Sequence, residues 1–177
     1  LFFEEVTPQV GLFLGTGAAI ITLIIVGLVV APQLVAGEKD AGTYDFTASL
    51  PVQRSAAAVA WVVLSAIVSV PAALAALLAA AWRFDLDFSV SWAVIPATAL
   101  ILVCGTLIGY AIAHGIERTS VTQILSKVFA FGIIGFTPIT YPPENMPDWL
   151  ATVHDFLPFY HMGVVFRAAL TDGLVTD

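Results

Sequence analysis

Residues 37–54 read GEKDAGTYDFTASLPVQR, and this polar stretch separates two long apolar ones. The flanking stretches, residues 10–36 and 56–82, contain no Asp, Glu, Lys or Arg. A bilayer core about 30 Å thick is crossed by roughly 20 apolar residues of α-helix. The sequence therefore predicts two membrane-spanning helices joined by an unusually polar connection.

The composition of the whole chain is typical of an integral membrane protein. Of its 177 residues, 59% are hydrophobic and 11% are charged, and the mean hydropathy is +0.97, well outside the range of soluble domains. Residues 92–115 predict a third span, and residues 120–137, which contain Lys127, predict a shorter fourth. We expect residues 1–177 to form a single transmembrane domain in the lipid bilayer, an all-α polytopic helical bundle. The net charge of −7 disfavours nucleic acid as a partner.

The basic residues predict how the spans are oriented, because Lys and Arg in short loops stay on the cytoplasmic side. If residues 37–54 are cytoplasmic, that side carries Lys39, Arg54, Arg118 and, by snorkelling, Lys127, while the other side carries Arg83 and Arg167. Ser120 and Gln123 form a capping-box pattern that would start the fourth helix within snorkelling reach of Lys127. We therefore expect a multi-pass protein of the plasma membrane with residues 37–54 in the cytoplasm.

A short helix is predicted inside the polar connection. Asp40 is a candidate N-cap and Pro51 is a stop signal. Between them, Thr43, Phe46 and Leu50 fall on one helical face. The resulting helix would lie along the membrane surface; a solvated loop with incidental periodicity is the alternative.

A second amphipathic helix is predicted at residues 145–157, on the outer side. Asn145 is a candidate N-cap. Apolar residues follow it at helical spacing, namely Met146, Trp149, Leu150, Val153 and Phe156. Trp149 would anchor this helix at the interface, and Pro158 would end it.

Small residues predict that the spans pack closely, since lipid supplies no hydrophobic drive between helices. Gly11 and Gly15 form a GxxxG pair in the first span, and Gly105 and Gly109 repeat this spacing in the third. Pro71 predicts a kink in the second span. These features favour a packed bundle.

The two polar segments resemble those of a known family. The inner motif consists of Glu38-Lys39-Asp40-Ala41-Gly42-Thr43, then Asp45, then Ser49-Leu50-Pro51-Val52-Gln53-Arg54. The outer motif consists of Pro138-Ile139-Thr140-Tyr141-Pro142, Met146-Pro147-Asp148-Trp149-Leu150, Leu157-Pro158 and Arg167. With the spans between them, these motifs resemble the permease subunits of type-2 ATP-binding-cassette (ABC) exporters over nearly the whole chain.

The resemblance implies a role for each motif. In that family the inner stretch is a coupling helix that docks on the ATPase subunit, which implies ATPase-coupling residues Glu38, Lys39, Gly42, Thr43, Asp45, Phe46, Leu50, Pro51 and Arg54. Among them, Glu38, Asp45 and Arg54 would make polar contacts, while Phe46 and Leu50 would pack. The outer stretch lines the gate where substrate leaves, which implies outer-gate residues Pro138, Tyr141, Pro142, Pro147, Trp149, Pro158 and Arg167. The chain departs from the family at Leu157, Tyr44 and Phe46, where Asn or aliphatic residues are commoner.

The resemblance also implies partners and further spans. The family has six spans, so the four here would be its second to fifth, with one before Leu1 and one after Asp177, unless this member is shorter. The implied partners are an ABC ATPase subunit and a second permease copy, identical or different. No GxxxxGK[ST] phosphate-binding loop occurs in the sequence. We therefore expect no cofactor in this chain, with ATP and magnesium bound by the ATPase subunit.

The expected function is export of a hydrophobic or amphipathic substrate, drug or lipid-like, with no catalytic or metal site in this chain. A channel or secondary transporter is an alternative, although the first three spans lack the central charged residue that ion coupling ordinarily uses. A membrane-embedded metalloenzyme is a further alternative. Its candidate ligands are His114 and Glu117, which would share a helix face, and His154, Asp155 and His161.

Overall fold

The computed structural model describes residues 8–137, 139, 147, 149–150, 152 and 157–171. Within these residues it contains helices and no strand. In this described part of the chain, four helices are long and apolar enough to cross a membrane: Gln9–Asp40, Ser55–Phe84, Val94–Gly115 and Thr119–Phe136. The predicted all-α membrane bundle is confirmed.

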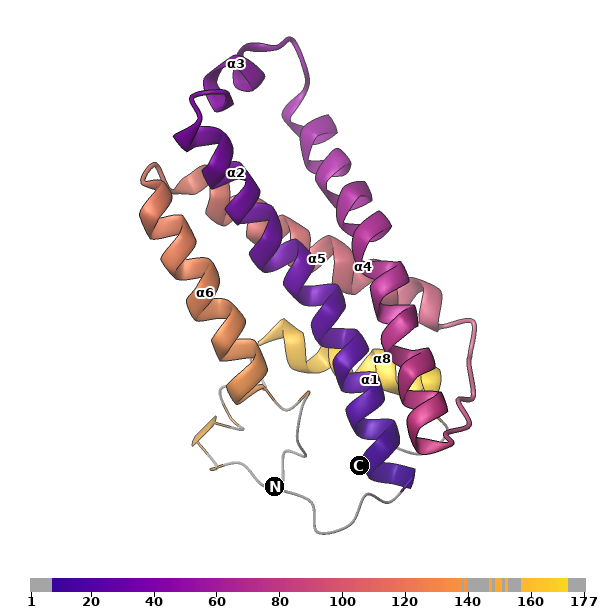
Figure 1. Ribbon diagram of the computed structural model, residues 1–177. Helices are drawn as coiled ribbons and strands as arrows, with labels where there is room; N and C mark the ends of the chain where they lie inside the picture. The colour runs from indigo at the N-terminus through magenta and orange to yellow at the C-terminus, as the bar shows by residue number, and fades with distance from the viewer. Residues whose placement is uncertain are drawn as a thin grey trace.

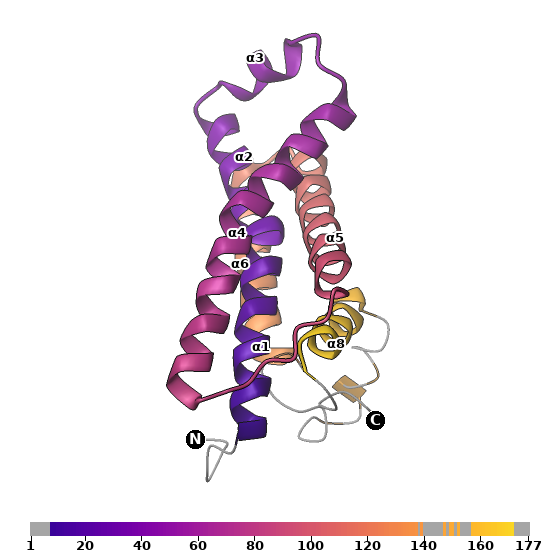
Figure 2. The same cartoon turned by 90° about the vertical axis from the view of Figure 1, so that its right-hand side faces the viewer.

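The helices form an elongated bundle with α3 (Tyr44–Ser49) at one end and α8 (Pro158–Leu170) at the other (Figures 1 and 2). The first span is built from α1 (Pro8–Ile25), the π-helix η1 (Val26–Val30) and α2 (Ala31–Asp40), and the others are α4 (Arg54–Phe84), α5 (Val94–Gly115) and α6 (Thr119–Phe136). The short helix α3 joins α2 to α4 at one end, and α8 lies across the bundle at the other. We call these the α3 end and the α8 end.

The first two spans are longer than a bilayer requires. The first runs unbroken over 32 residues, about 48 Å at 1.5 Å per residue, against a hydrocarbon core of about 30 Å. Because the helix continues past Gly37 to Asp40, the polar connection begins inside α2. Asp40 is therefore the last residue of α2 and does not cap α3, and the predicted N-cap was wrong. Thr43 precedes α3 instead, without a side-chain cap.

Gly42 ends α2 by a specific backbone motif. Its φ of +71° lies in the left-handed region, where glycine carries no Cβ penalty. The N–H of Gly42 donates to the carbonyl of Lys39 at 3.1 Å, and the N–H of Thr43 donates to that of Glu38 at 3.0 Å. This pair of bonds is a Schellman motif, which satisfies carbonyls that the end of a helix leaves open.

The helices η1 and α5 cross at very short range. A methyl group added at Gly27 would meet the Thr106 backbone N at 2.7 Å, and one added at Gly109 would overlap the Gly27 carbonyl oxygen. The absence of side chains at both positions lets the two backbones touch. Gly11 and Gly15 have a similar role on α1, where an added Cβ at Gly15 would meet the Cβ of Ala80 in α4 at 2.7 Å.

The predicted start of the fourth helix needs correction. Arg118, not Ser120, is the residue before α6, and it makes no side-chain cap bond. Ser126, in the interior of α6, directs its hydroxyl to the Thr122 carbonyl at 2.8 Å. Lys127 lies midway along α6 and is exposed.

The second span is a single bent helix that contains a proline. The helix α4 continues through Pro71 without a break, and its bend is visible in Figure 2.

The helix α8 was not predicted. The sequence indicated that Pro158 ends an amphipathic helix, whereas Pro158 is the first residue of α8. Proline suits this first position because its missing N–H would have no intrahelical partner there. The predicted helix at residues 145–157 falls mostly outside the described residues.

We predict that replacing Gly109 with alanine destabilises the bundle, because the new methyl group forces η1 and α5 apart. The expected loss of unfolding free energy is about 1–3 kcal/mol, measured by thermal unfolding in mild detergent. Gly132 is the matched control, since no neighbour among the described residues lies within 4 Å of an added Cβ there. Gly132→Ala should leave stability unchanged or raise it slightly, because alanine favours helix. Equal effects of both substitutions would contradict the close crossing.

Candidate functional site: the α3 segment and the apolar cavity

The α3 segment, residues 41–53, presents apolar side chains away from the bundle. Phe46 is 71% exposed, Val52 59% and Leu50 44%. No residue of α3 is buried, and Asp45 lies exposed in its first turn. Exposed apolar side chains gathered on a polar connection are typical of a protein-binding surface.

The predicted coupling residues divide into three groups. Glu38 and Lys39 lie half-buried in the last turn of α2. Gly42 and Thr43 form the turn that ends this helix. Asp45, Phe46, Leu50 and Pro51 are exposed on or just after α3, and Arg54 is the first residue of α4. The structure therefore presents Asp45, Phe46, Leu50 and Pro51 outward and uses Gly42 and Thr43 for the backbone turn.

Lys39 points into the bundle. Its Nζ donates to the carbonyl oxygens of Ala113 at 2.7 Å and Ile116 at 2.9 Å. These carbonyls lie where α5 ends at Gly115, and the negative end of the helix dipole favours a cation there. Lys39 thus caps α5 from another helix.

An aromatic cluster surrounds this cap. Nζ of Lys39 lies 4.9 Å from the ring centroid of Tyr44 in α3. The Tyr44 ring contacts that of His114 in α5, with centroids 5.7 Å apart, and His114 stacks on Tyr110 at 3.9 Å. The Nδ1 of His114 lies 2.9 Å from the Tyr110 carbonyl oxygen, so this nitrogen carries the proton that is donated. The cluster joins α2, α3 and α5.

The helix face that the metal-site alternative needs at His114 and Glu117 does not form. The prediction that His114 and Glu117 share a helix face was wrong, because α5 ends at Gly115 and Ile116 is extended. Among the residues that the structure describes, no group of three or more His, Cys, Asp or Glu could hold a metal ion. His154 and Asp155 lie outside those residues.

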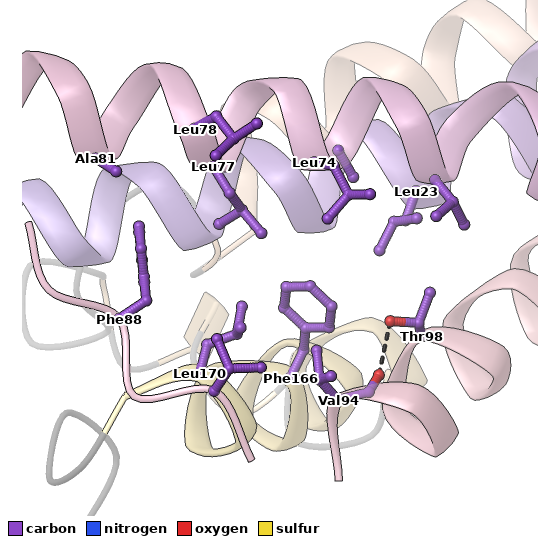
Figure 3. A pocket seen from close by; sticks show the side chains of 13 residues that line it. Leu23, Leu74, Leu77, Leu78, Ala81, Phe88, Val94, Thr98, Phe166 and Leu170 are labelled. Atoms are coloured by element: carbon purple, nitrogen blue, oxygen red, sulfur yellow. Dashed lines mark hydrogen bonds between the residues drawn. The ribbon is translucent and has the colours of Figure 1, made fainter. Parts of the chain in front are cut away.

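A cavity of about 250 Å³ opens near the α8 end, between α4 on one side and α5 and α8 on the other (Figure 3). Its lining is apolar except for one hydroxyl: Leu23, Val70, Ala73, Leu74, Leu77, Leu78, Ala81, Phe88, Val90, Val94, Thr98, Phe166 and Leu170. The Thr98 hydroxyl is used within its own helix, donating to the Val94 carbonyl at 2.7 Å. The cavity therefore suits hydrocarbon.

Most of the cavity lining was missed from the sequence. The six residues from α4 recur at helical spacing between Val70 and Ala81, but this span is apolar on every face, so the pattern does not stand out. The signal for α8 was present and was overlooked. Its buried residues Phe159, Met162, Phe166 and Leu170 follow the i, i+3, i+7 pattern of an amphipathic helix.

The predicted outer-gate residues separate into exposed and buried ones. Pro147, Trp149 and Pro158 are exposed, and Pro138, Tyr141 and Pro142 lie outside the described residues. Arg167, by contrast, is only 5% exposed. It was predicted as a gate residue, and the structure places its side chain inside the bundle.

The guanidinium of Arg167 fixes α8 against α1. Its Nε donates to the Thr16 hydroxyl at 3.2 Å, Nη2 donates to the Ile139 carbonyl, and its Cζ lies 3.7 Å from the ring centroid of Phe13. Burial lowers the pKa of Arg167 to about 10, an effect that Tyr160 partly opposes. The side chain therefore stays charged at neutral pH, held by hydrogen bonds and a cation–π contact.

Comparison with known proteins agrees with this architecture. Neither the curated proteins nor the solved structures provide a match. A family model described as ABC-2 family transporter protein matches residues 3–176, which is nearly the whole chain. The chain therefore belongs to the ABC-2 transporter family, as a multi-pass membrane permease subunit of an ABC-type transporter.

Proposed function

We propose that this permease exports a hydrophobic or amphipathic substrate, with energy from ATP hydrolysis by a separate ABC ATPase subunit that docks on the α3 segment. The observation that carries the proposal is the exposed apolar surface of Phe46, Leu50 and Val52 at the tip of two overlong helices. The sequence contains no phosphate-binding loop of its own. The exposed surface and the lack of this loop together favour a separate ATPase subunit as the source of energy.

The α3 segment has the composition of a docking site. A central aromatic side chain surrounded by smaller apolar and polar groups is the usual form of an interaction hot spot. Phe46 would be the anchor, Leu50 and Val52 would widen the apolar contact, and Asp45 would add a charge at its edge. ATP and magnesium would bind to the ATPase subunit, and a second permease copy would complete the transporter.

The proposal requires the α3 end to face the cytoplasm, where ATP is present. The bias of Lys and Arg toward this end supports that orientation in the plasma membrane. The α8 end, with the exposed Trp149 and Pro158, would then carry the gate through which substrate leaves.

The cavity supports an apolar cargo. Its walls offer hydrocarbon contact and leave no side-chain polar group free, since the Thr98 hydroxyl is already bonded. A drug-like molecule or a lipid chain gains free energy in such a site in proportion to the apolar area it buries. An ion or a sugar would find no polar partner there.

We predict that residue 47 is labelled only from the cytoplasmic side. A Thr47→Cys variant, made with Cys104→Ala to remove the native thiol, should react with a membrane-impermeant maleimide in inside-out vesicles and not in intact cells. Thr47 is exposed, and so is Trp92 at the opposite end. A Trp92→Cys variant should show the reverse pattern, and exchanged patterns would reject the orientation.

We predict that Phe46→Ala weakens ATPase binding by about tenfold or more, or about 1.4 kcal/mol, through loss of the central apolar contact. The measurement is binding of the ATPase subunit, encoded beside or purified with the permease, to permease in lipid nanodiscs. Trp92→Ala is the matched control, because Trp92 is an aromatic residue that is 82% exposed at the other end. Equal binding by both variants would remove the docking role from α3.

We predict that Leu77→Trp obstructs the cavity, because Leu77 points into it opposite Phe166 (Figure 3). Retention of a spin-labelled fatty acid by the reconstituted permease should weaken by about tenfold, the scale for excluding an apolar group from a pocket. Leu64→Trp on the same helix is the control, since Leu64 does not line the cavity. Unchanged retention in Leu77→Trp would argue against this cavity as the cargo site.

A further inference from the structure

We infer that α5 is the lever that carries movement of the α3 segment to the α8 end, and that Lys39 is the positioning residue that connects it. This inference rests on the proposed docking of an ATPase on α3 and assigns Lys39 a role inside the permease. Contacts of the described residues support this at three places along α5: its C-terminal end near α3, its crossing with η1, and its N-terminal end near α8. We call the contacts at the two ends the joints of the lever.

The first joint lies at the α3 end. Lys39 holds the C-terminal end of α5 through two hydrogen bonds, to the carbonyl of Ala113 in its last turn at 2.7 Å and to that of Ile116, just after the helix, at 2.9 Å. Hydrogen bonds from a charged donor are stronger than neutral ones. Because Lys39 is part of α2, displacement of the α3 segment pulls on the end of α5 through a charged contact.

A second contact at the same joint comes from α3 itself. The Tyr44 ring lies against His114, and His114 stacks on Tyr110 one turn earlier in α5. Lys39 also lies over the Tyr44 ring at 4.9 Å. Both α2 and α3 therefore contact the C-terminal end of α5.

The lever is a continuous helix that reaches the opposite end. Its 22 residues extend about 33 Å at 1.5 Å per residue. Before its first turn, the N–H of Ser91 donates to the Ala169 carbonyl of α8 at 2.8 Å. Val94 of α5 and Phe166 of α8 line the cavity together. A tilt of α5 would therefore change the position of α8 and the width of the cavity.

The crossing with η1 is suited to a pivot. Gly27 and Gly109 place backbone against backbone there, with no interlocking side chains at either position. The first span also changes to a π-helix over Val26–Val30 at this level, and π-helical turns are frequent at functional sites. Thr106, which faces Gly27, has a buried hydroxyl with no hydrogen-bond partner among the described residues.

A purely structural role for Lys39 would predict a different outcome. If Lys39 only capped α5, its loss would lower stability and leave the response to ATP intact in the folded fraction. If it touched the ATPase, its loss would weaken docking. A connecting residue should instead preserve docking and lose the ATP-dependent change at α8.

The experiment uses the complete transporter in liposomes, with its ATPase subunit bound. A bimane fluorophore is attached at Ala168→Cys, an exposed position of α8, in a Cys104→Ala background. Three quantities are measured for each variant: the amount of ATPase bound, the thermal stability, and the bimane signal on addition of Mg-ATP. The matched control is Lys127→Met, which removes an exposed lysine from α6.

Lys39→Met should bind the ATPase normally and lose the ATP-dependent bimane change by about tenfold, within the range of measured coupling between sites. Lys39→Arg should keep most of the change, because its guanidinium can still donate to the α5 carbonyls. His114→Leu, which removes the Tyr44 contact from the α5 side, should reduce the change even if Lys39→Met fails to fold. The control should respond like the unmodified protein.

Two results would overturn the inference. An unaltered bimane response in folded Lys39→Met and His114→Leu would exclude α5 as the lever. Loss of ATPase binding in Lys39→Met would make Lys39 a docking residue instead. Absence of any ATPase from the unmodified transporter would be a different result, since it would reject the proposed function on which the inference rests.

Discussion

Hydrocarbon offers no hydrogen-bond partner, so every backbone N–H and C=O group within the bilayer must be satisfied inside the protein. The four long helices of this permease meet that requirement within each span. The constraint is most demanding where helices end. The Schellman turn at Gly42 satisfies α2 from its own backbone, whereas the end of α5 receives Lys39 from a different helix. Helix termination therefore also connects the elements of the bundle.

The same constraint determines how the spans pack. Because lipid and leucine are equally apolar, helices associate through close contact and internal polar bonds. Gly27 and Gly109 provide the close contact between η1 and α5. Arg167 provides the polar bonds at the α8 end, where its buried charge joins α8 to Thr16 and the Ile139 carbonyl. The spans thus contact one another at a central crossing and at both ends, and an apolar cavity remains beside α8.

The proposed coupling to a separate ATPase needs an exposed docking surface and a connected path from that surface into the bundle. The α3 segment is exposed, with Phe46 at its tip. Behind it, Tyr44 and Lys39 reach α5, and α5 reaches α8. Residues of one sequence motif thus divide between outward and inward roles. In the proposed function, the outward Phe46 would contact the ATPase and the inward Lys39 would contact α5.

Sequence patterns were enough to predict the helical membrane class, the family resemblance and the polar connection between the first two spans, because hydropathy and composition are local properties. It misplaced the start of α3 at Asp40 and missed α8, although the buried pattern from Phe159 to Leu170 was present. The folded bundle was needed to show that Lys39 faces α5 and which face of α4 lines the cavity. On a helix that is apolar all round, no local pattern marks the inner face, and packing alone selects it.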